Sequence, residues 1–434
     1  MKIGAISLGC DKNRVDTEKM LARLAAAGHT IVPTEDDADL IVINTCAFTK
    51  EAQQEAINEI LSVAALKERR PELRIAVTGC FPERYHGEFA KWFPEVDVFL
   101  GIGDYDHIAE AVESAARGEK YGLCKGADLY YPERIVTTPN HYAYLKVAEG
   151  CSNHCTYCAI PSIRGKYRSE REENLLKEAE RLAGDGVKEL ILVAQDVTRY
   201  GTDIYGEPRL IPLVKGLCGL GFDRIRLMYL EPEMVDDKLI EFIATQDKVC
   251  RYADIPLQHV DTEVLKRMNR HTDEQKTREL VRKVKQAGIT MRTSFISGFP
   301  GESRKAHAKL RDFIAEAEID FAGIFGYSRE EGTPADRMKG HLPQVVIRSR
   351  TKELRAVEES VITRNAKAQK GKILRVLYEG IDYKRQCFYG RTDRQAPDID
   401  SVVLFTSDGT VDIGEYYNVE VTDADGIDLI GKTV

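Results

Sequence analysis

The sequence predicts an α/β protein in three parts: an open parallel α/β sheet, a partial (β/α)6 barrel and a small C-terminal β-barrel. Three observations support this fold class. Apolar runs alternate with amphipathic helical patterns over about the first 100 residues, a longer alternation begins at Tyr142, and short alternating strands with turn residues close the chain. A chain of 434 residues is also long for one domain, so two or three are expected.

The first part, residues 1–116, is predicted to form the open sheet. Each of three nearly continuous apolar runs is followed by a helical pattern, and these runs are residues 2–10, 39–46 and 74–80. Strands that are apolar on both faces need cover on both sides, which helices provide in a parallel sheet.

Each of these runs ends in a cysteine, Cys10, Cys46 or Cys80. The carboxyl ends of parallel strands lie along one edge of a sheet, so the three thiols can converge. For any single cysteine, inert packing is the commoner interpretation, because free cysteine is among the most buried residue types. Since all three share one position and two follow a glycine (Gly9 and Gly79), their joint interpretation is a thiolate cluster.

The middle of the chain is predicted to be a partial barrel. Residues 117–136 have weak periodicity and several turn residues, which favours a linker, and Cys124 has no assigned role there. In residues 137–366 most gaps between candidate strands hold a helical pattern; the strands are residues 142–149, 188–196, 224–230, 252–259, 290–299 and 322–328. Units of this kind predict a barrel whose chemistry lies at the carboxyl ends of its strands.

The last part, residues 367–434, follows a basic helical stretch at 346–372 and is predicted to form the small β-barrel. Its composition is acidic: from Ala368 to Val434 there are eight Lys or Arg against twelve Asp or Glu, a net charge of −4.

Composition indicates a globular protein of the cytoplasm without a membrane segment. The chain carries a net charge of −8, begins without a basic export signal and has no apolar stretch of about 18 residues. Its ten cysteines are therefore expected to stay reduced, which favours metal binding or catalysis over disulfides.

Three of these cysteines, Cys151, Cys155 and Cys158, lie in the stretch CSNHCTYC directly after the first barrel strand. Zinc prefers paired C-x2-C units, but the next cysteine is Cys218, and His154 lies between the ligands. Structural zinc and inert packing are the alternatives to an iron–sulfur cluster with one unligated iron. An open coordination position is what catalysis needs and what structural sites avoid.

The spacing C-x3-C-x2-C after the first barrel strand resembles the signature of radical S-adenosylmethionine enzymes, with Tyr157 at the aromatic position near the adenine. The whole chain resembles the methylthiotransferase family, which joins an N-terminal three-cysteine domain (1–116 here), a linker (117–136), a radical S-adenosylmethionine core (137–366) and a TRAM domain (367–434). Six segments look most like the members that modify an aspartate of small-subunit ribosomal protein twelve: ISLGCDKNRVDTE, INTCAF, AEGCSNHCTYCAIPSIRGKYRS, ADIPLQH, LKRMNR and GYSREEGTPA.

The resemblance implies two [4Fe-4S] clusters, one on each triad, and S-adenosylmethionine used once as radical source and once as methyl donor. An unactivated carbon–hydrogen bond has no acidic proton, so a cofactor radical is needed to open it. The cluster on Cys151, Cys155 and Cys158 would generate that radical, and the other cluster would carry the sulfur inserted at the β-carbon of the aspartate. The implied partners are the ribosomal protein and an electron donor such as flavodoxin or ferredoxin.

Contacts to S-adenosylmethionine are predicted for five residues, and no catalytic acid or base is assigned; the five are Tyr157, Gln195, Gln258, Ser294 and Gly298. Gln195 with Asp196, and Gln258 with His259, end barrel strands and would project at the mouth. SFISGFPGE (294–302) resembles a glycine-containing strand motif, although a turn that simply needs Gly298 and Gly301 is an equal alternative. A structural role for His259, and solvated charge for Arg164 and Lys166, are the commoner interpretations.

Two other functions are weighed against this one. Methylthiolation of adenosine in tRNA is the nearest alternative, but an acidic C-terminal part repels phosphate and attracts a basic ribosomal protein. Direct RNA binding is then secondary, although the basic stretch at 346–372 favours it. A non-catalytic iron–sulfur protein is disfavoured, because structural sites usually close their coordination.

Overall fold

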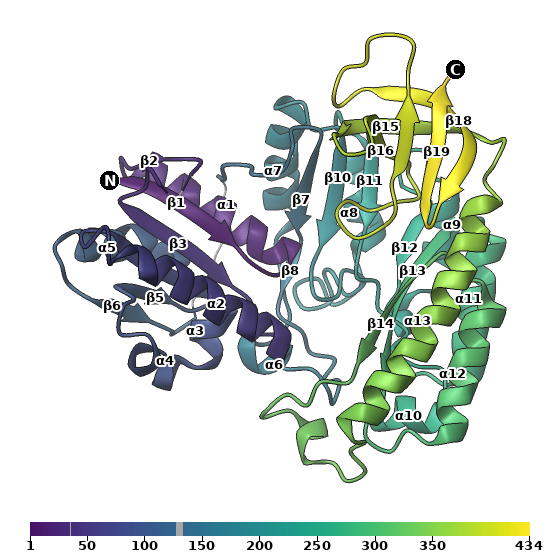
Figure 1. The fold of residues 1–434 in the computed structure, drawn as a ribbon, viewed down its shortest axis with the longest axis horizontal. Helices are drawn as coiled ribbons and strands as arrows, with labels where there is room; N and C mark the ends of the chain where they lie inside the picture. The colour runs from purple at the N-terminus through teal and green to yellow at the C-terminus, as the bar shows by residue number, and fades with distance from the viewer. Residues whose placement is uncertain (35, 127–132) are drawn as a thin grey trace.

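The structure is a computed structural model that describes residues 1–34, 36–126 and 133–434. Figure 1 shows the N-terminal sheet on the left, the barrel strands with their outer helices on the right, and the small β-barrel at the top, where the C-terminus lies. The predicted fold class is confirmed.

The N-terminal sheet is parallel, with strand order β2-β1-β3-β4-β5-β6. Its strands are β1 (Lys2–Ser7), β2 (Thr30–Ile31), β3 (Leu40–Thr45), β4 (Arg74–Gly79), β5 (Val98–Leu100) and β6 (Tyr121–Leu123). Its helices are α1 (Asp11–Ala26), α2 (Lys50–Leu66), α3 (Cys80–Arg84), α4 (His86–Trp92), the short 3-10 helix η1 (Tyr105–His107) and α5 (Ile108–Ala116). All six residues of β3 are buried, as expected of a central strand covered on both faces.

Part of the predicted linker, residues 117–136, belongs to this sheet. Tyr121–Leu123 forms the edge strand β6, which pairs with β5. Its three residues, none of them buried, leave no periodic pattern for the sequence to reveal. Cys124 follows directly, and its thiol lies 3.6 Å from the carbonyl oxygen of Pro82. The remainder of the linker includes residues 127–132, which lie outside the described part of the chain.

The barrel strands run parallel in two groups of three, β7-β10-β11 and β12-β13-β14, linked by a parallel bridge between Ile225 and Val249. The strands are β7 (Tyr142–Lys146), β10 (Glu189–Val193), β11 (Arg224–Leu227), β12 (Tyr252–Asp254), β13 (Thr290–Ser297) and β14 (Phe321–Gly326). The short strands β8 (Ala148–Glu149) and β9 (Arg168–Ser169) pair antiparallel around the cysteine loop. In this part of the chain β7 and β14 are therefore the two edges of an incomplete barrel.

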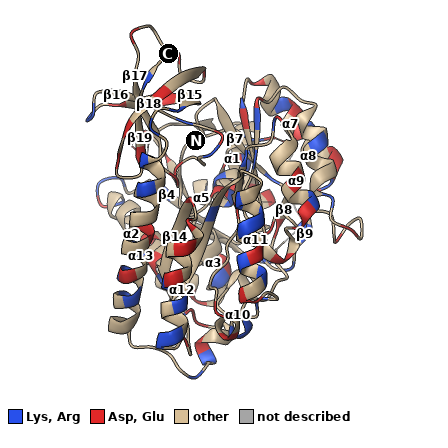
Figure 2. Ribbon diagram, turned by 90° about the vertical axis from the view of Figure 1, so that its right-hand side faces the viewer, with Lys and Arg blue, Asp and Glu red and all other residues tan. Residues whose placement is uncertain are grey.

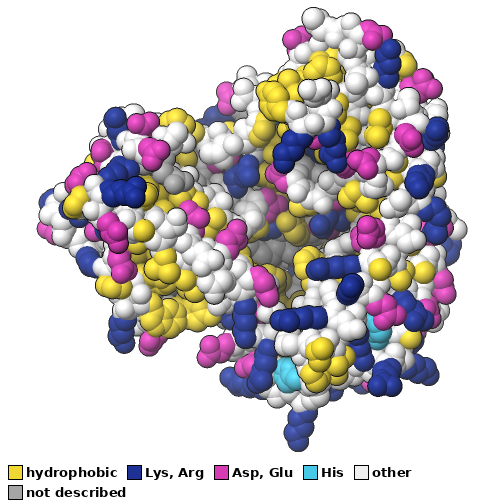
Figure 3. All heavy atoms as spheres, viewed as in Figure 1, with side chains coloured by type: hydrophobic (Ala, Val, Ile, Leu, Met, Phe, Trp, Pro, Cys, Tyr) yellow, Lys and Arg dark blue, Asp and Glu magenta, His cyan; other side chains and the backbone are white. Residues whose placement is uncertain are grey.

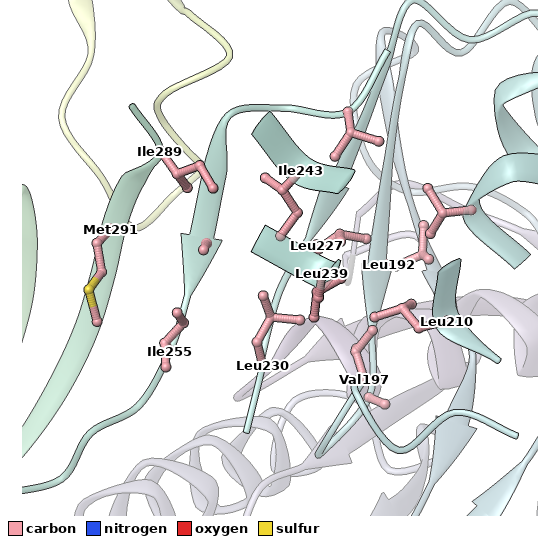
Figure 4. Close-up of a cluster of buried hydrophobic side chains, with 14 of the residues drawn as sticks. Leu192, Val197, Leu210, Leu227, Leu230, Leu239, Ile243, Ile255, Ile289 and Met291 are labelled. Carbon is pink, nitrogen blue, oxygen red and sulfur yellow. The ribbon is translucent and has the colours of Figure 1, made fainter. Parts of the chain in front are cut away.

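Helices cover the outside of the barrel strands. They are α7 (Glu172–Gly184), α8 (Leu210–Cys218), α9 (Asp237–Thr245), α10 (Thr262–Arg267), α11 (Glu274–Gln286), α12 (Arg304–Ala317) and α13 (Gln344–Lys367), with α6 (Ile160–Ile163), η2 (Pro232–Met234) and η3 (Pro334–Arg337) in loops. Figure 4 shows Leu192 and Leu227 of the strands packed against Leu239 and Ile243 of α9. Burial of each such side chain contributes about 1.5–3 kcal/mol to the free energy of folding. Outward faces are charged, and basic and acidic residues mix on α11 and α12 (Figure 2).

The N-terminal domain spans the gap between the two barrel edges. On the β7 side, the ammonium of Lys146 pairs with Asp16 of α1. On the β14 side, the carboxylate of buried Glu330 accepts from Arg84 at 3.2 Å and from the backbone of Lys50 at 3.0 Å. The domain that carries the N-terminal cysteines therefore covers the open side of the barrel.

The C-terminal domain is a closed barrel of five strands in the order β15-β16-β17-β19-β18. Its strands are β15 (Ile373–Asp382), β16 (Cys387–Arg391), β17 (Val403–Thr406), β18 (Tyr416–Asp425) and β19 (Asp428–Thr433). The domain packs at the amino ends of the barrel strands, where fully buried Glu189 accepts from Arg226 at 2.6 Å and pairs with Arg391 at 3.2 Å. No helix of the described residues is long and apolar enough to cross a membrane.

Candidate functional site

The three N-terminal cysteines meet at one edge of the sheet, as the sequence predicts. Cys10 stands at the N-cap of α1, Cys46 follows β3, and Cys80 is the first residue of α3. The thiols of Cys46 and Cys80 share a hydrogen bond, and Cys10 is close enough to act on both electrostatically. The positive end of α1 favours a thiolate at Cys10.

Two glycines make room for this triad. Gly9 has a φ of +86°, and a Cβ there would lie 2.5 Å from Cys46 Cβ. Gly79 has a φ of +94°, and a Cβ there would lie 2.2 Å from Asn44 Oδ1. Both positions therefore need glycine for conformation and for space, which explains why two of the three cysteines follow one.

The N-terminal thiols do not share one protonation state. The hydrogen bond from Cys46 lowers the pKa of Cys80 to about 6, and the guanidinium of Arg164 acts in the same direction. That hydrogen bond, together with burial, raises the pKa of Cys46, and burial raises the pKa of Cys10. A thiol must lose its proton to bind iron, so Cys80 is the member best prepared to do so.

The second triad lies on the loop after β8. The backbone amide of Cys151 donates to the carbonyl of Gly165 at 3.1 Å, which closes the loop at its base. Backbone amides also point at two thiols: Asn153 N lies 3.5 Å from Cys151 Sγ, and Ile160 N lies 3.4 Å from Cys158 Sγ. The loop therefore holds donors that stabilise sulfur ligands once they are ionised.

A guanidinium stands beside the third thiol of this loop. Arg270, which is 6% exposed, places Nη1 at 3.6 Å from Cys155 Sγ and Nη2 at 2.6 Å from Glu231 Oε1. Burial raises the pKa of Cys155, and Arg270 opposes that shift. Burial, with a hydrogen bond to Glu233, raises the pKa of Glu231 to about 9.

Arg164 joins the two triads. It follows Cys158 on the same loop and is 3% exposed, which corrects the expectation of a solvated charge, whereas Lys166 is exposed. Its Nη1 donates to Glu149 Oε2 at 2.8 Å, and its Nη2 lies 3.5 Å from Cys80 Sγ. Nη2 also donates to Asn13 of the N-terminal domain.

Glu149 is the centre of the charge network around Arg164. Besides Arg164, it pairs with Lys146 at 3.0 Å and accepts from Gln195 Nε2 at 2.9 Å. Burial opposes its ionisation, but Arg164 and Lys146 outweigh burial and hold the pKa of Glu149 well below its ordinary value. The carboxylate therefore stays ionised and keeps both cations in place between the triads.

A cavity of 410 Å³ opens beside Cys10 and is lined by all three parts of the chain. Tyr144 and Met228 come from the barrel interior, Tyr229 from the end of β11, and residues 396–399 from the C-terminal domain. The ammonium of Lys12 lies 3.3 Å from the centre of the Tyr229 ring. The cavity provides space next to an N-terminal thiol and inside the barrel at once.

Of the predicted S-adenosylmethionine contacts, Tyr157 and Gln195 lie beside the second triad and its network. Tyr157 hydrogen-bonds Cys155 and packs near Met268 and Phe299. The amide nitrogen of Gln195 donates a hydrogen bond to Glu149. Its buried Oε1 receives no hydrogen bond from any described residue. That orphaned acceptor fits a ligand donor at the mouth of the barrel.

The other three predicted contacts lie on or beside β13. Gln258, with a φ of +66°, bridges β13 through Ser294 O and Ile296 N, each at 2.8 Å. Ser294 is half-buried on the strand itself. Gly298 has a local reason to be glycine, because a Cβ there would lie 2.7 Å from Ile347 Cγ1 of α13.

His259 and Asp196 serve the structure. His259 is fully buried; its Nδ1 accepts from the backbone of Asp261 at 2.9 Å, and its Nε2 lies 3.6 Å from Glu302. Asp196 accepts from Asn153 and Arg199 and so orients the cysteine loop. These contacts agree with the commoner interpretation of His259.

The donor set fits clusters better than single ions. Among the described residues, no three His, Cys, Asp or Glu side chains are grouped closely enough to hold one metal ion. A cubane cluster needs thiolates spread over separate irons, and three thiols leave one iron open. Each triad supplies three thiols, with glycines that make room at the N-terminal triad and backbone donors at the second.

Sequence reasoning missed the charged residues that organise the site: Asp16, Lys146, Glu149, Glu231 and Arg270. Glu149 and Glu231 follow the ends of β7 and β11, and strand-end position is the signal that could have found them. Asp16 and Arg270 lie on helical or loop segments, where a charged residue is normally taken for a solvated one.

Family profiles cover the three parts of the chain separately. The uncharacterized protein family UPF0004 matches residues 2–101, the radical SAM superfamily matches residues 145–314, and the TRAM domain matches residues 371–434. Among solved structures, the radical S-adenosylmethionine methyltransferase TsrM from Kitasatospora setae aligns with a TM-score of 0.58 at 14% identity, over 77% of this chain and 76% of that one. This likeness supports the fold of the barrel.

Relatives of similar length are much closer in sequence. Ribosomal protein uS12 methylthiotransferase RimO of Clostridium botulinum (strain Okra) is 43% identical over 99% of this chain and 98% of its own. RimO of Geotalea uraniireducens is 44% identical over 100% of this chain and 98% of its own. The chain belongs to the RimO family of ribosomal protein uS12 methylthiotransferases.

Proposed function

We propose that this protein is a radical S-adenosylmethionine methylthiotransferase of the cytoplasm that places a methylthio group on the β-carbon of an aspartate in ribosomal protein uS12. Family membership over nearly the whole chain supports the reaction class. The observation that carries the proposal is the packing of the loop of the second triad against the domain that holds the first. Ala159 and Ile163, directly after Cys158, pack in the core of the N-terminal domain with Cys80.

Each triad is proposed to hold one [4Fe-4S] cluster with an open iron, and an external donor such as flavodoxin or ferredoxin to supply electrons. When bound, the cluster on Cys151, Cys155 and Cys158 supplies one-electron cleavage of S-adenosylmethionine, the chemistry an unactivated carbon–hydrogen bond requires. The N-terminal triad, Cys10, Cys46 and Cys80, is proposed to present the sulfur, which a second S-adenosylmethionine methylates. The two roles need different environments, and one thiol of the N-terminal triad, Cys80, has a lowered pKa, whereas burial raises the pKa of each thiol in the second triad.

The residues of this chain prepare that division of work. Arg164 and Lys146 neutralise Glu149 between the triads and hold the cysteine loop against the N-terminal domain. On the other side of the loop, Arg270 contacts Glu231 at 2.6 Å and opposes the rise that burial causes in the pKa of Cys155. Tyr157, Gln195, Gln258, Ser294 and Gly298 are proposed to bind S-adenosylmethionine, and the unsatisfied Oε1 of Gln195 is the strongest support among them.

Methylthiolation of tRNA adenosine is the second candidate, and one observation favours it: basic residues of α13 line a surface groove. The acidic C-terminal domain opposes it, because eight Lys or Arg against twelve Asp or Glu repel a phosphate backbone. A Lys- and Arg-rich ribosomal protein is attracted by the same surface.

The test uses reconstituted enzyme with a reductant and S-adenosylmethionine, offered uS12 or tRNA in parallel. We expect release of 5′-deoxyadenosine and the mass gain of a methylthio group on one aspartate of uS12. A methylthio mass gain on tRNA alone would contradict uS12 as the substrate. If protein that contains iron and sulfide releases no 5′-deoxyadenosine, the radical S-adenosylmethionine reaction is contradicted.

A further inference from the structure

A groove of 710 Å³ runs between the start of α2, the segment after β14 and the outer face of α13. Five cations line it, Lys50, Arg329, Arg348, Lys352 and Arg355, against the two carboxylates of Glu51 and Glu359. Arg329 is paired with Asp336 at 2.6 Å, so the groove has a local excess of two positive charges in a chain of net charge −8. Lys and Arg side chains gather over α13 beside the central hollow in Figure 3.

Three of these cations form no ion pair with another described residue. Among the described residues, Lys50, Arg348 and Lys352 have no ion-pair partner and are exposed. Other cations of α13 are committed: Arg350 pairs with Glu302 at 2.5 Å, and Arg364 pairs with Glu318 at 2.9 Å. Unpaired cations grouped in a groove mark a surface for an external anion.

The spacing suits an extended anion. Arg348 and Lys352 are four residues apart on α13, so their side chains leave the same face about 5–6 Å apart. Arg355 donates to the carbonyl of Ile324 at 2.9 Å, which caps the exposed edge of β14 and gives the groove a fixed wall. Charges aligned along a helix follow a chain of phosphates better than a single small ion.

The groove lies at the rim of the site. Lys50 follows Cys46 by four residues, and its backbone amide donates to Glu330, where the N-terminal domain closes on the β14 side of the barrel. A macromolecule seated in the groove would therefore contact the enzyme where the N-terminal domain meets the β14 side of the barrel.

We infer that this groove binds the phosphodiester backbone of ribosomal RNA beside the target protein, so that the enzyme acts on uS12 within the small subunit. This inference rests on the proposed function, which supplies the ribosomal substrate. It assigns RNA to α13 instead of to the acidic C-terminal domain.

The test measures binding of the reconstituted enzyme to purified small ribosomal subunits, and to free uS12, as a function of salt. The groove variant is Arg348→Gln with Lys352→Gln. The matched control is Arg282→Gln with Lys177→Gln, two exposed cations on α11 and α7. Thermal unfolding of both double variants checks that each is folded.

Loss of two phosphate contacts should reduce the slope of log affinity against log salt by about 1.4 on subunits and weaken binding about 25-fold near 0.1 M salt. The control pair should leave that slope unchanged. The preference for subunits over free uS12, taken as the ratio of affinities, should fall with the groove variant.

Equal slopes for the groove and control variants would overturn the inference. Equal losses on subunits and on free uS12 would also overturn it, because they would place protein instead of RNA in the groove. These outcomes concern binding alone. If wild-type enzyme modifies neither subunits nor free uS12, the proposed function fails whatever the groove binds.

Discussion

Replacing Arg164 by methionine should separate the N-terminal domain from the cysteine loop. The side chain is 3% exposed, and its guanidinium holds Glu149 at 2.8 Å and Asp16 at 3.5 Å. Removing one partner of a buried ion network leaves uncompensated charge and costs about 3–5 kcal/mol. Because Lys146 still contacts both carboxylates, we expect the lower end, about 3 kcal/mol.

The assay is urea unfolding followed by tryptophan fluorescence. Trp92 is the single tryptophan of the chain and lies on α4, so its signal follows the N-terminal domain. A loss of about 3 kcal/mol lowers the midpoint by about 1–2 M urea. Lys166→Met, an exposed cation of the same loop, should change stability by no more than about 0.5 kcal/mol. If Arg164→Met shifts the midpoint no more than Lys166→Met, the bridging role of Arg164 is refuted.

Gly79→Ala should lower the iron bound at the Cys46 triad, because the added Cβ would lie 2.2 Å from the side-chain oxygen of Asn44. The control for iron content is Gly28→Ala, since Gly28 also has a positive φ, +89°, but an added Cβ there would meet open space. Glu189→Gln removes a negative charge that pairs with buried Arg391, so it should lower the free energy of unfolding in urea by about 3–5 kcal/mol. An unchanged free energy of unfolding would contradict this. Burial raises the pKa of Glu358 from 4.5 to about 7, so its contribution to stability is full below pH 4.5 and is lost as the pH rises through about 7. Glu358→Gln should therefore unfold at a higher temperature than wild type at pH 8 and at nearly the same temperature at pH 4; a pH-independent difference would contradict the assignment.

Much of the fold was predictable because periodicity and strand-end position are local signals. The six cysteines and the barrel strands follow from apolar runs that end in chemistry-bearing residues. The three-residue strand β6 was not predictable, because its pairing with β5 depends on tertiary contact alone. Burial of Arg164 was likewise hidden, since it arises from Asn13 and Asp16 of a distant helix.

The most direct test of the account is to remove each triad separately and measure iron, sulfide and 5′-deoxyadenosine together. With Cys155→Ala, half of the iron and all cleavage of S-adenosylmethionine should be lost, since this triad is proposed to bind the cofactor. With Cys46→Ala, half of the iron should be lost while cleavage continues, and uS12 should gain no methylthio group. Full iron content in the Cys46→Ala variant, or equal loss of cleavage in both, would contradict two clusters with separate tasks.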